Sequence, residues 1–220
     1  MMKKLSVKFC GLTRVDDVKT AVNLGVDALG LVFVEQSPRY ISLEQAALLS
    51  LEIPAFTTVV ALVVNMPEQE LVALSHQVRF DVVQFHGDES AHACHLMSQR
   101  ICKRWIKAIR IKPDDTRSSI LSQINELAKF GASGVILDTF NAQMFGGTGE
   151  SFDWNKIPGN APLPIYLAGG LTPDNIGQVI ANQDLVEKIH GVDVSGGIEY
   201  KKGLKCEKKM AMFMDQLKFA

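Results

Sequence analysis

A cysteine stands where the first predicted strand of the chain ends. Apolar residues lead up to Cys10, and Gly11 follows directly before a helix start. In parallel α/β folds, catalytic side chains gather at the carboxyl ends of the strands. A thiol ordinarily has a pKa of about 8.5, so Cys10 could act as a nucleophile or as a general base. We favour the base, since no histidine is an obvious partner for a nucleophile; a cysteine that only packs in the core is the alternative.

An aspartate ends another predicted strand in the second half of the chain. Asp138 follows the apolar run Val135-Ile136-Leu137. A carboxyl there is partly removed from water and could serve as a general acid. The alternative is a structural aspartate that caps a helix or accepts local hydrogen bonds. His86 is the one histidine at a strand end, where it could bind substrate or act as a structural hydrogen-bond donor.

Two glycine-rich turns follow the last two predicted strands. Gly169 and Gly170 come after the seventh strand, and Ser195 and Gly196 come after the eighth, just beyond Asp193. Glycines let backbone N–H groups approach an anion closely. One such pair could be an ordinary turn, but two pairs after adjacent strands predict a phosphate site.

An arginine lies in the loop after the second predicted strand, in the run Ser37-Pro38-Arg39-Tyr40. A turn stiffened by proline can hold a guanidinium over the mouth of a barrel, where it would bind a carboxylate through two hydrogen bonds. A solvated surface arginine is the equal alternative.

The sequence predicts no metal site and no organic cofactor. His92, Cys94 and His95 fall on different faces of one predicted helix. Phe33 and Val64 end the second and third strands, whereas a metal site in a barrel would need His or Asp at several strand ends. This also argues against the metal-dependent sugar-phosphate epimerases that share the barrel.

Short β-rich apolar runs alternate with helical patterns along the whole chain. This alternation predicts a single (β/α)8 TIM barrel with eight parallel strands, one domain over residues 1–220. A doubly wound sheet would instead place a glycine fingerprint after the first strand. The predicted strands are Ser6–Phe9, Ala28–Phe33, Thr58–Val64, Val82–Phe85, Arg104–Ile109, Val135–Asp138, Ile165–Ala168 and Gly191–Val194. The predicted helices are Arg14–Leu24, Leu43–Leu51, Pro67–His76, Glu89–Gln99, Thr116–Phe130, Pro173–Ala181 and Glu207–Leu217, with only a short Phe152–Ile157 piece after the sixth strand.

Composition limits the partners. The 23 basic and 24 acidic residues give a formal net charge of -1, and no long basic run is present, so we expect neither a nucleic acid nor a membrane as partner. No apolar stretch could span a bilayer, and the N-terminus lacks a signal-peptide cleavage site. Four cysteines without a C-x-x-C pair are typical of reduced thiols, so we expect a cytoplasmic protein.

Taken together, these segments resemble phosphoribosylanthranilate isomerase of tryptophan biosynthesis. The resemblance extends nearly end to end, and its motifs are highly specific as a set. The matching segments are Lys8-Phe9-Cys10-Gly11-Leu12-Thr13, Ser37-Pro38-Arg39-Tyr40, Val83-Gln84-Phe85-His86-Gly87, Leu137-Asp138-Thr139, Gly146-Gly147-Thr148-Gly149, Phe152-Asp153-Trp154, Leu167-Ala168-Gly169-Gly170-Leu171 and Asp193-Val194-Ser195.

The resemblance implies an Amadori rearrangement of a phosphoribosyl arylamine without metal or cofactor. By it, the residue matching Asp138 is the general acid on the ring oxygen, and the one matching Cys10 is the general base at C2. Arg39 would hold the anthranilate carboxylate, and Asp193 would contact sugar hydroxyls. The amides around Gly169, Gly170, Ser195 and Gly196 would bind the phosphate. The protein would be a monomer or homodimer with a small sugar-phosphate substrate.

The chain departs from the family pattern near its end. Two consecutive serines usually follow Asp-Val, whereas this chain has Ser195-Gly196, and the usual Pro-Gly-x-Lys-Asp reads Lys202-Gly203-Leu204-Lys205-Cys206. Two alternatives stay open at this point. Indole-glycerol-phosphate synthase would need a lysine acid, for which Lys107 is the one plausible candidate. A non-catalytic phosphate-binding barrel would be expected to lack Cys10 or Asp138.

Overall fold

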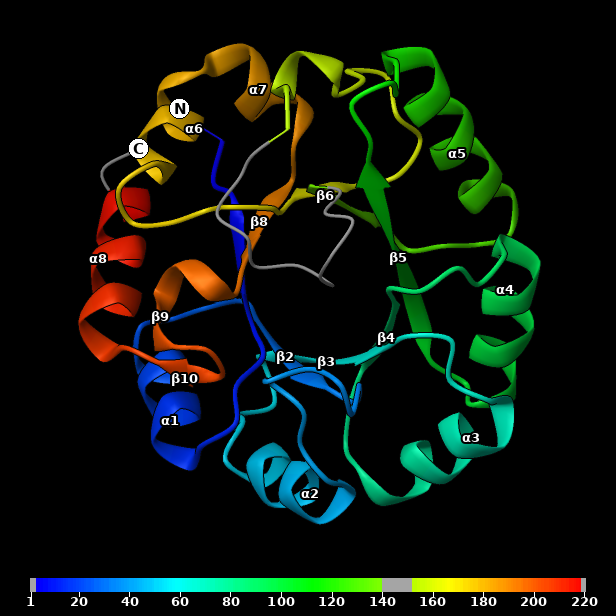
Figure 1. Ribbon diagram of the computed structural model, residues 1–220, viewed down its shortest axis with the longest axis vertical. Coiled ribbons are helices and arrows are strands. Elements are labelled where there is room, and N and C mark those ends of the chain that lie inside the picture. The colour runs from blue at the N-terminus through cyan, green and yellow to red at the C-terminus, as the bar shows by residue number, and fades with distance from the viewer. Residues whose placement is uncertain (1–2, 140–151, 219–220) are drawn as a thin grey trace.

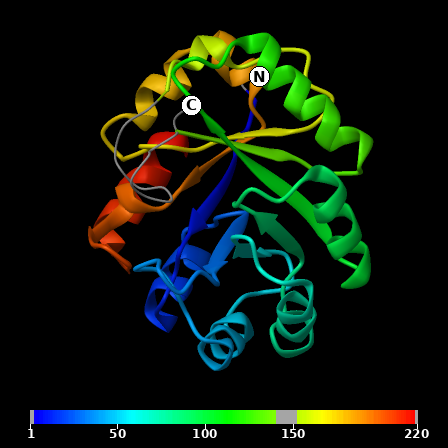
Figure 2. The same ribbon diagram turned by 45° about the vertical axis from the view of Figure 1, so that its right-hand side comes forward.

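The computed structural model describes residues 3–139 and 152–218, which form a closed barrel of parallel strands. Each strand pairs with the next in chain order, and the eighth pairs with the first. Helices surround the strands in both ribbon views (Figures 1 and 2). The strands are β1 (Ser6–Cys10), β2 (Ala28–Val32), β3 (Thr58–Val63), β4 (Val82–Phe85), β5 (Arg104–Ile111), β6 (Val135–Thr139), β7 (Ile165–Leu167) and β8 (Gly191–Val194).

The predicted barrel is confirmed, as is the order of its eight strands, whereas a second helix between β7 and β8, α7 (Gln183–Lys188), is not predicted from the sequence. The quoted segment Gly146-Gly147-Thr148-Gly149 lies outside the described residues, as does most of the loop after Asp138. The α-helices are α1 (Val15–Asn23), α2 (Leu43–Leu51), α3 (Glu68–Gln77), α4 (Ala91–Arg100), α5 (Arg117–Lys129), α6 (Ile176–Ala181), α7 (Gln183–Lys188) and α8 (Glu207–Lys218), with a 3-10 turn, η1 (Trp154–Lys156), between β6 and β7.

Alternate residues of each strand face the barrel interior and the helices, because side chains alternate along a strand. The outward residues join the helices in one large core. Inside, a small apolar layer of Val60, Val82, Ile106, Ala108, Ile136 and Ala168 fills the barrel. Cys10 packs with Val32, Val34 and Leu62 above that layer, toward the carboxyl ends of the strands. The interior is thus closed below Cys10 and open above it.

Residues typical of helix starts precede three of the predicted helices, namely Ser42, Asn65 before Pro67, and Thr172-Pro173-Asp174; the structure confirms one of these three starts. The Ser42 hydroxyl accepts the Gln45 N–H at 3.2 Å and caps α2. Asn65 does not cap α3; its side chain instead accepts the N–H of Asp88 at 2.8 Å, because a loop contact outcompetes the local cap. The run Thr172-Pro173-Asp174 forms a turn stabilised by Asn175, so α6 starts only at Ile176.

The segment after β8 contains elements that the sequence pattern does not predict. A 3-10 turn, η2 (Gly196–Ile198), leads into a two-stranded hairpin of β9 (Glu199–Lys201) and β10 (Leu204–Lys205). The hairpin turns at Gly203, whose φ is +81° and whose missing side chain leaves room for the Pro38 carbonyl: a Cβ would come within 2.1 Å of that oxygen. The hairpin therefore packs against the loop that carries Arg39.

No helix within the described residues is both long and apolar enough to cross a membrane.

Candidate active site

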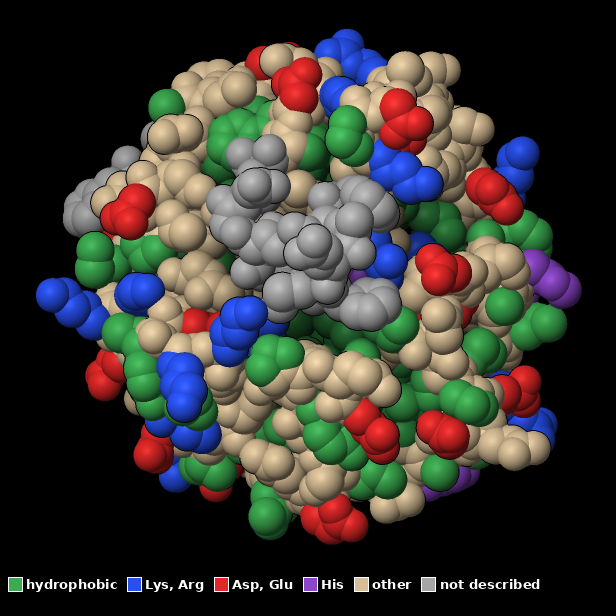
Figure 3. All heavy atoms as spheres, in the orientation of Figure 1, with side chains coloured by type: hydrophobic (Ala, Val, Ile, Leu, Met, Phe, Trp, Pro, Cys, Tyr) green, Lys and Arg blue, Asp and Glu red, His purple; other side chains and the backbone are tan. Residues whose placement is uncertain are grey.

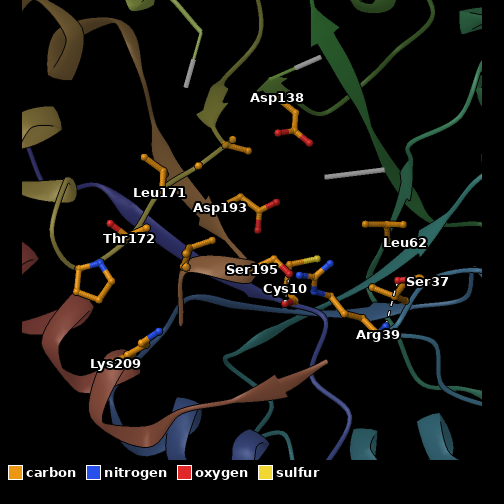
Figure 4. A pocket seen from close by; sticks show the side chains of 18 of the residues that line it. Cys10, Ser37, Arg39, Leu62, Asp138, Leu171, Thr172, Asp193, Ser195 and Lys209 are labelled. Carbon is orange, nitrogen blue, oxygen red and sulfur yellow. Dashed lines mark hydrogen bonds between the residues drawn. The ribbon is translucent and has the colours of Figure 1, made fainter. Parts of the chain in front are cut away.

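One cavity of about 610 Å³ opens at the carboxyl ends of the strands. All the residues predicted from sequence as site residues line it, although they come from six different strand ends. Figure 4 shows Cys10 and Asp138 pointing into it from different sides, with Asp193 between them in this view. The predicted residues along its wall are Cys10, Arg39, His86, Asp138, Gly169, Gly170, Asp193, Ser195 and Gly196.

Cys10 is buried at the end of β1, opposite Gly30 on β2. A Cβ at Gly30 would lie 2.7 Å from the Cys10 sulfur, so the glycine leaves the space that the thiol occupies. Burial disfavours the thiolate and raises the pKa of Cys10 above its usual range, with a smaller contribution from Asp193. The cations Lys8 and Lys205 oppose this rise in part.

A buried ion pair lies in the barrel beside Cys10. The Lys8 ammonium donates to Asp193 Oδ1 at 2.9 Å, and both side chains are nearly excluded from solvent. Burial alone would lower the pKa of Lys8, but the attraction of Asp193 and Cys10 outweighs it and raises that pKa. Lys8 therefore stays cationic, and one oxygen of Asp193 is occupied before any substrate arrives.

Asp138, at the end of β6, is held in place by its neighbours. The backbone N–H of Thr139 donates to Asp138 Oδ1 at 2.9 Å, and His86 Nε2 lies 3.3 Å from Asp138 Oδ2. The Gln84 amide nitrogen lies 3.3 Å from His86 Nδ1. Within the described residues, His86 Nε2 is buried without a hydrogen-bond partner, so it faces Asp138 as a close neighbour and not as a hydrogen-bond donor. His86 thus lines the cavity and also contacts the carboxyl.

Arg39 is part of a buried ion cluster with Glu199 and Lys205. Its guanidinium donates to both carboxylate oxygens of Glu199, at 2.8 and 2.9 Å. Lys205 Nζ donates to Glu199 Oε1 at 2.9 Å. Burial by itself would raise the pKa of Glu199, but the two cations lower it, so Glu199 is a carboxylate. Arg39 is therefore neither a solvated surface side chain nor an unpaired cation.

The glycine turns after β7 and β8 contact each other. Gly169 and Gly170 have φ values of +84° and +66°, which favour glycine. A Cβ at Gly197 would lie 1.8 Å from the Leu171 carbonyl oxygen, so the two turns meet backbone to backbone. Lys208 and Lys209 line this end of the cavity, and basic side chains gather over α8 and the β9–β10 hairpin (Figure 3). The arrangement suits an anion.

The candidate lysine for a synthase lies elsewhere. Lys107 is not among the residues of this cavity; it points away and donates to Glu89 Oε2 at 2.9 Å and to the Gly87 carbonyl at 2.7 Å. Among residues 3–139 and 152–218, no three His, Cys, Asp or Glu side chains are grouped so as to hold a metal ion.

The sequence pattern does not predict Lys8, Glu199 and Lys205, which contact residues of the site or one another, nor Lys208 and Lys209, which line the cavity. Lys8 carries a signal, since a charged residue inside an apolar strand, two positions before Cys10, must share its face. Glu199 and Lys205 carry none, because both belong to the unpredicted hairpin.

Comparison with known proteins agrees with this geometry. The family model described as N-(5'-phosphoribosyl)anthranilate (PRA) isomerase matches residues 7–216. The N-(5'-phosphoribosyl)anthranilate isomerase of Pseudomonas putida (strain GB-1) is 41% identical over 219 residues, covering 100% of both chains. That of Acinetobacter calcoaceticus is 41% identical over 94% of this chain and 93% of its own.

Solved structures give the same result. The phosphoribosyl anthranilate isomerase of Thermotoga maritima has a TM-score of 0.84 at 31% identity, covering 98% of this chain and 100% of its own. Another, with a TM-score of 0.81 at 31% identity over 98% of this chain and 100% of its own, is in complex with reduced 1-(O-carboxyphenylamino)-1-deoxyribulose 5-phosphate. The resemblance inferred from the motifs is confirmed, and the chain belongs to the N-(5'-phosphoribosyl)anthranilate isomerase family.

Proposed function

We infer that the chain is a phosphoribosylanthranilate isomerase of tryptophan biosynthesis. It converts N-(5-phosphoribosyl)anthranilate to 1-(2-carboxyphenylamino)-1-deoxyribulose 5-phosphate. Besides the family match, the observation that carries this inference is the presence of Cys10 and Asp138 in one cavity. The test is to incubate the purified protein with phosphoribosylanthranilate and follow the loss of anthranilate-type fluorescence. An indole-glycerol-phosphate synthase or a non-catalytic barrel would leave the substrate unchanged.

The proposed reaction needs one acid and one base. Asp138 gives its proton to the furanose oxygen, the C1–O bond breaks, and the arylamine nitrogen forms an iminium with C1. The iminium acidifies C2, and the Cys10 thiolate takes the C2 proton to give a neutral enolamine, which tautomerises to the ketone. Moving a proton in this way requires no metal or organic cofactor.

The neighbours of the acid support its role. Once Asp138 has given up its proton, its charge is stabilised by the Thr139 N–H and by the ring of His86, 3.3 Å away. Asp193 is held by Lys8 and lines the cavity, which suits it to accept from a sugar hydroxyl.

Arg39 is the residue that we propose binds the anthranilate carboxylate. We expect Arg39→Ala to raise KM by about 10- to 150-fold with a smaller effect on kcat, the scale of a charge-assisted contact of about 1.5 to 3 kcal/mol. The measurement is steady-state kinetics on phosphoribosylanthranilate and on the N-phosphoribosyl adduct of aniline, which lacks the carboxylate. Arg39 does not bind the carboxylate if the variant is equally impaired on both.

The backbone N–H groups of the turns at Gly169–Gly170 and Ser195–Gly196 are the proposed phosphate site. Gly170→Val should raise KM by about tenfold or more, since a side chain there blocks the approach of the anion and costs at least one charge-assisted bond. Inhibition by inorganic phosphate should weaken in parallel.

A matched control separates this effect from backbone strain. Gly25 also has a positive φ, +80°, but a Cβ there has nothing within 4 Å. Gly25→Val should therefore carry a similar strain and leave KM and phosphate inhibition unchanged. Equal kinetics for the two variants would locate the phosphate elsewhere.

We further propose a cytoplasmic enzyme with a sugar phosphate as its substrate and no nucleic-acid partner, as a monomer or homodimer. Scattered free cysteines support the cytoplasmic location, and the near-zero net charge supports the expectation of no nucleic-acid partner. The Thermotoga maritima relative is described as dimeric, and light scattering after gel filtration would measure the mass of this chain.

A further inference from the structure

The guanidinium of Arg39 is held in a fixed direction from several sides. The backbone N–H of Arg39 donates to the Ser37 hydroxyl at 3.1 Å and fixes the loop from which the side chain extends; Figure 4 draws this contact as a dashed line. Its stem lies against Gly11, where a Cβ would come within 2.4 Å of Arg39 Cδ. Its Nε and Nη2 both donate to Glu199. Within residues 3–139 and 152–218, Glu199 is the one partner that accepts hydrogen bonds from the charged group itself, so it sets the direction of the guanidinium.

Glu199 belongs to an element with no other evident task. It starts β9, and Lys205 ends β10, so the two strands of the hairpin supply the two partners. Lys205 Nζ has three acceptors: Glu199 Oε1 at 2.9 Å, the Ser195 carbonyl at 3.1 Å and the Ser195 hydroxyl at 3.4 Å. Burial lowers the pKa of Lys205, but the Glu199 carboxylate opposes that fall. Three acceptors match the three N–H groups of an ammonium, so the contacts of Lys205 are those of the charged amine.

The cluster carries one positive charge that no carboxylate within the cluster neutralises. Arg39, Glu199 and Lys205 are 7%, 7% and 1% exposed, and they comprise two cations and one carboxylate. A buried excess charge is unfavourable unless an opposite charge approaches it. Because Arg39 lines the cavity, an anion that enters there balances the cluster, whereas a neutral group does not.

We propose that Glu199 is a positioning residue, which aims the Arg39 guanidinium at the carboxylate of an N-aryl substrate, and that Lys205 keeps the cluster cationic so that carboxylated arylamines are preferred over neutral ones. This inference rests on the proposed binding of the carboxylate by Arg39.

The cluster is also connected to the catalytic cysteine. Lys205 donates to the Ser195 carbonyl, and the Ser195 hydroxyl donates to the Cys10 carbonyl at 2.9 Å. The contacts of the cluster thus extend through Ser195 to the backbone of Cys10.

The test is a selectivity ratio: kcat/KM for phosphoribosylanthranilate divided by kcat/KM for the N-phosphoribosyl adduct of aniline. Glu199→Gln keeps the shape but removes the charge and the second acceptor oxygen. The variant also gives the cluster one more positive charge, which by itself would favour the anionic substrate. We expect the lost orientation of Arg39 to outweigh this and to lower the ratio by about tenfold or more, the equivalent of one charge-assisted hydrogen bond. A general loss of structure would lower both rate constants and leave the ratio unchanged.

Glu89→Gln is the matched control. Glu89 is also a nearly buried carboxylate paired with a lysine, Lys107, at 2.9 Å, but it lies outside the cavity. Its replacement should leave the ratio within about twofold, because distant sites without shared partners couple only weakly. If Glu199→Gln fails to fold, Glu199→Gln combined with Lys205→Met keeps the net charge of the cluster and should show the same lowered ratio.

The possible results separate the inference from the proposal beneath it. If Arg39→Ala lowers the ratio and Glu199→Gln does not, Glu199 does not position Arg39, and the carboxylate role of Arg39 stands. A ratio that rises in Glu199→Gln would mean that Glu199 competes with the substrate carboxylate, which also overturns the inference. If Arg39→Ala itself leaves the ratio unchanged, the carboxylate is bound elsewhere and both statements are wrong.

Discussion

Cys10→Ala is expected to lower kcat by about 10² to 10⁴, the usual contribution of a general base, while the protein stays folded. The thiol is small and is the one titratable group that lies at the end of β1. Steady-state kinetics and a thermal unfolding curve would be measured together. A variant that keeps more than about a tenth of the wild-type kcat would mean that the base lies elsewhere.

Cys94→Ala is the matched control for this experiment. Cys94 is also a buried free cysteine, but it lies on α4, and burial raises its pKa to about 12. Burial raises the pKa of both thiols, so what distinguishes Cys94 is its place: it does not line the cavity and cannot reach a substrate there. We expect its replacement to leave kcat unchanged.

The pH dependence should carry the signature of a buried thiol. Thiols ordinarily titrate at higher pH than carboxylic acids. The catalytically active protonation state of Cys10 and Asp138, a thiolate with a protonated carboxyl, is therefore a minor form of the pair. The kcat/KM profile should be flat through neutral pH. Its alkaline limb reports Cys10 and should lie above the ordinary thiol range, because burial raises the pKa of Cys10.

Asp138→Asn should lower kcat by about 10² to 10⁴ with little change in KM, because an amide keeps the shape and cannot deliver a proton. It should also change the slope of kcat/KM against pH, from flat to rising through neutral pH. Without the carboxyl, only the thiolate limits the rate, so the residual kcat/KM should rise about tenfold per pH unit up to the pKa of Cys10. A profile that stays flat through neutral pH in the variant, as in the wild type, would remove Asp138 from the role of acid.

Asp81→Asn provides the comparison for Asp138. Asp81 precedes β4 at the amino ends of the strands and accepts the N–H of Val59 at 2.8 Å, so it is structural and remote from the cavity. Its replacement should reduce the stability of the fold, and the dependence of kcat/KM on pH should be the same as in the wild type.

The elements that form the barrel could be predicted from the sequence because each depends on its own residues. A buried parallel strand is a short apolar run, and a turn at positive φ needs glycine, so both leave a local pattern. Cys10 and Asp138 could be found for the same reason. The carboxyl ends of all the strands lie at the same face of a parallel barrel, so a residue at a strand end is placed at that face. Their catalytic roles, like the prediction of a single domain over 1–220, stay predictions.

The tertiary structure alone decided how the charges of the site are arranged. Arg39 and Glu199 are 160 positions apart, and no local pattern links an arginine loop to a hairpin that itself went unpredicted. Asn65 shows the same limit, since its contact with Asp88 replaced the cap expected from its neighbours. A buried cation pairs with the acceptor that the fold places beside it, whatever the distance along the chain. Long-range packing determines which acceptor that is, and the short-range spacing of residues in the sequence contains no information about it.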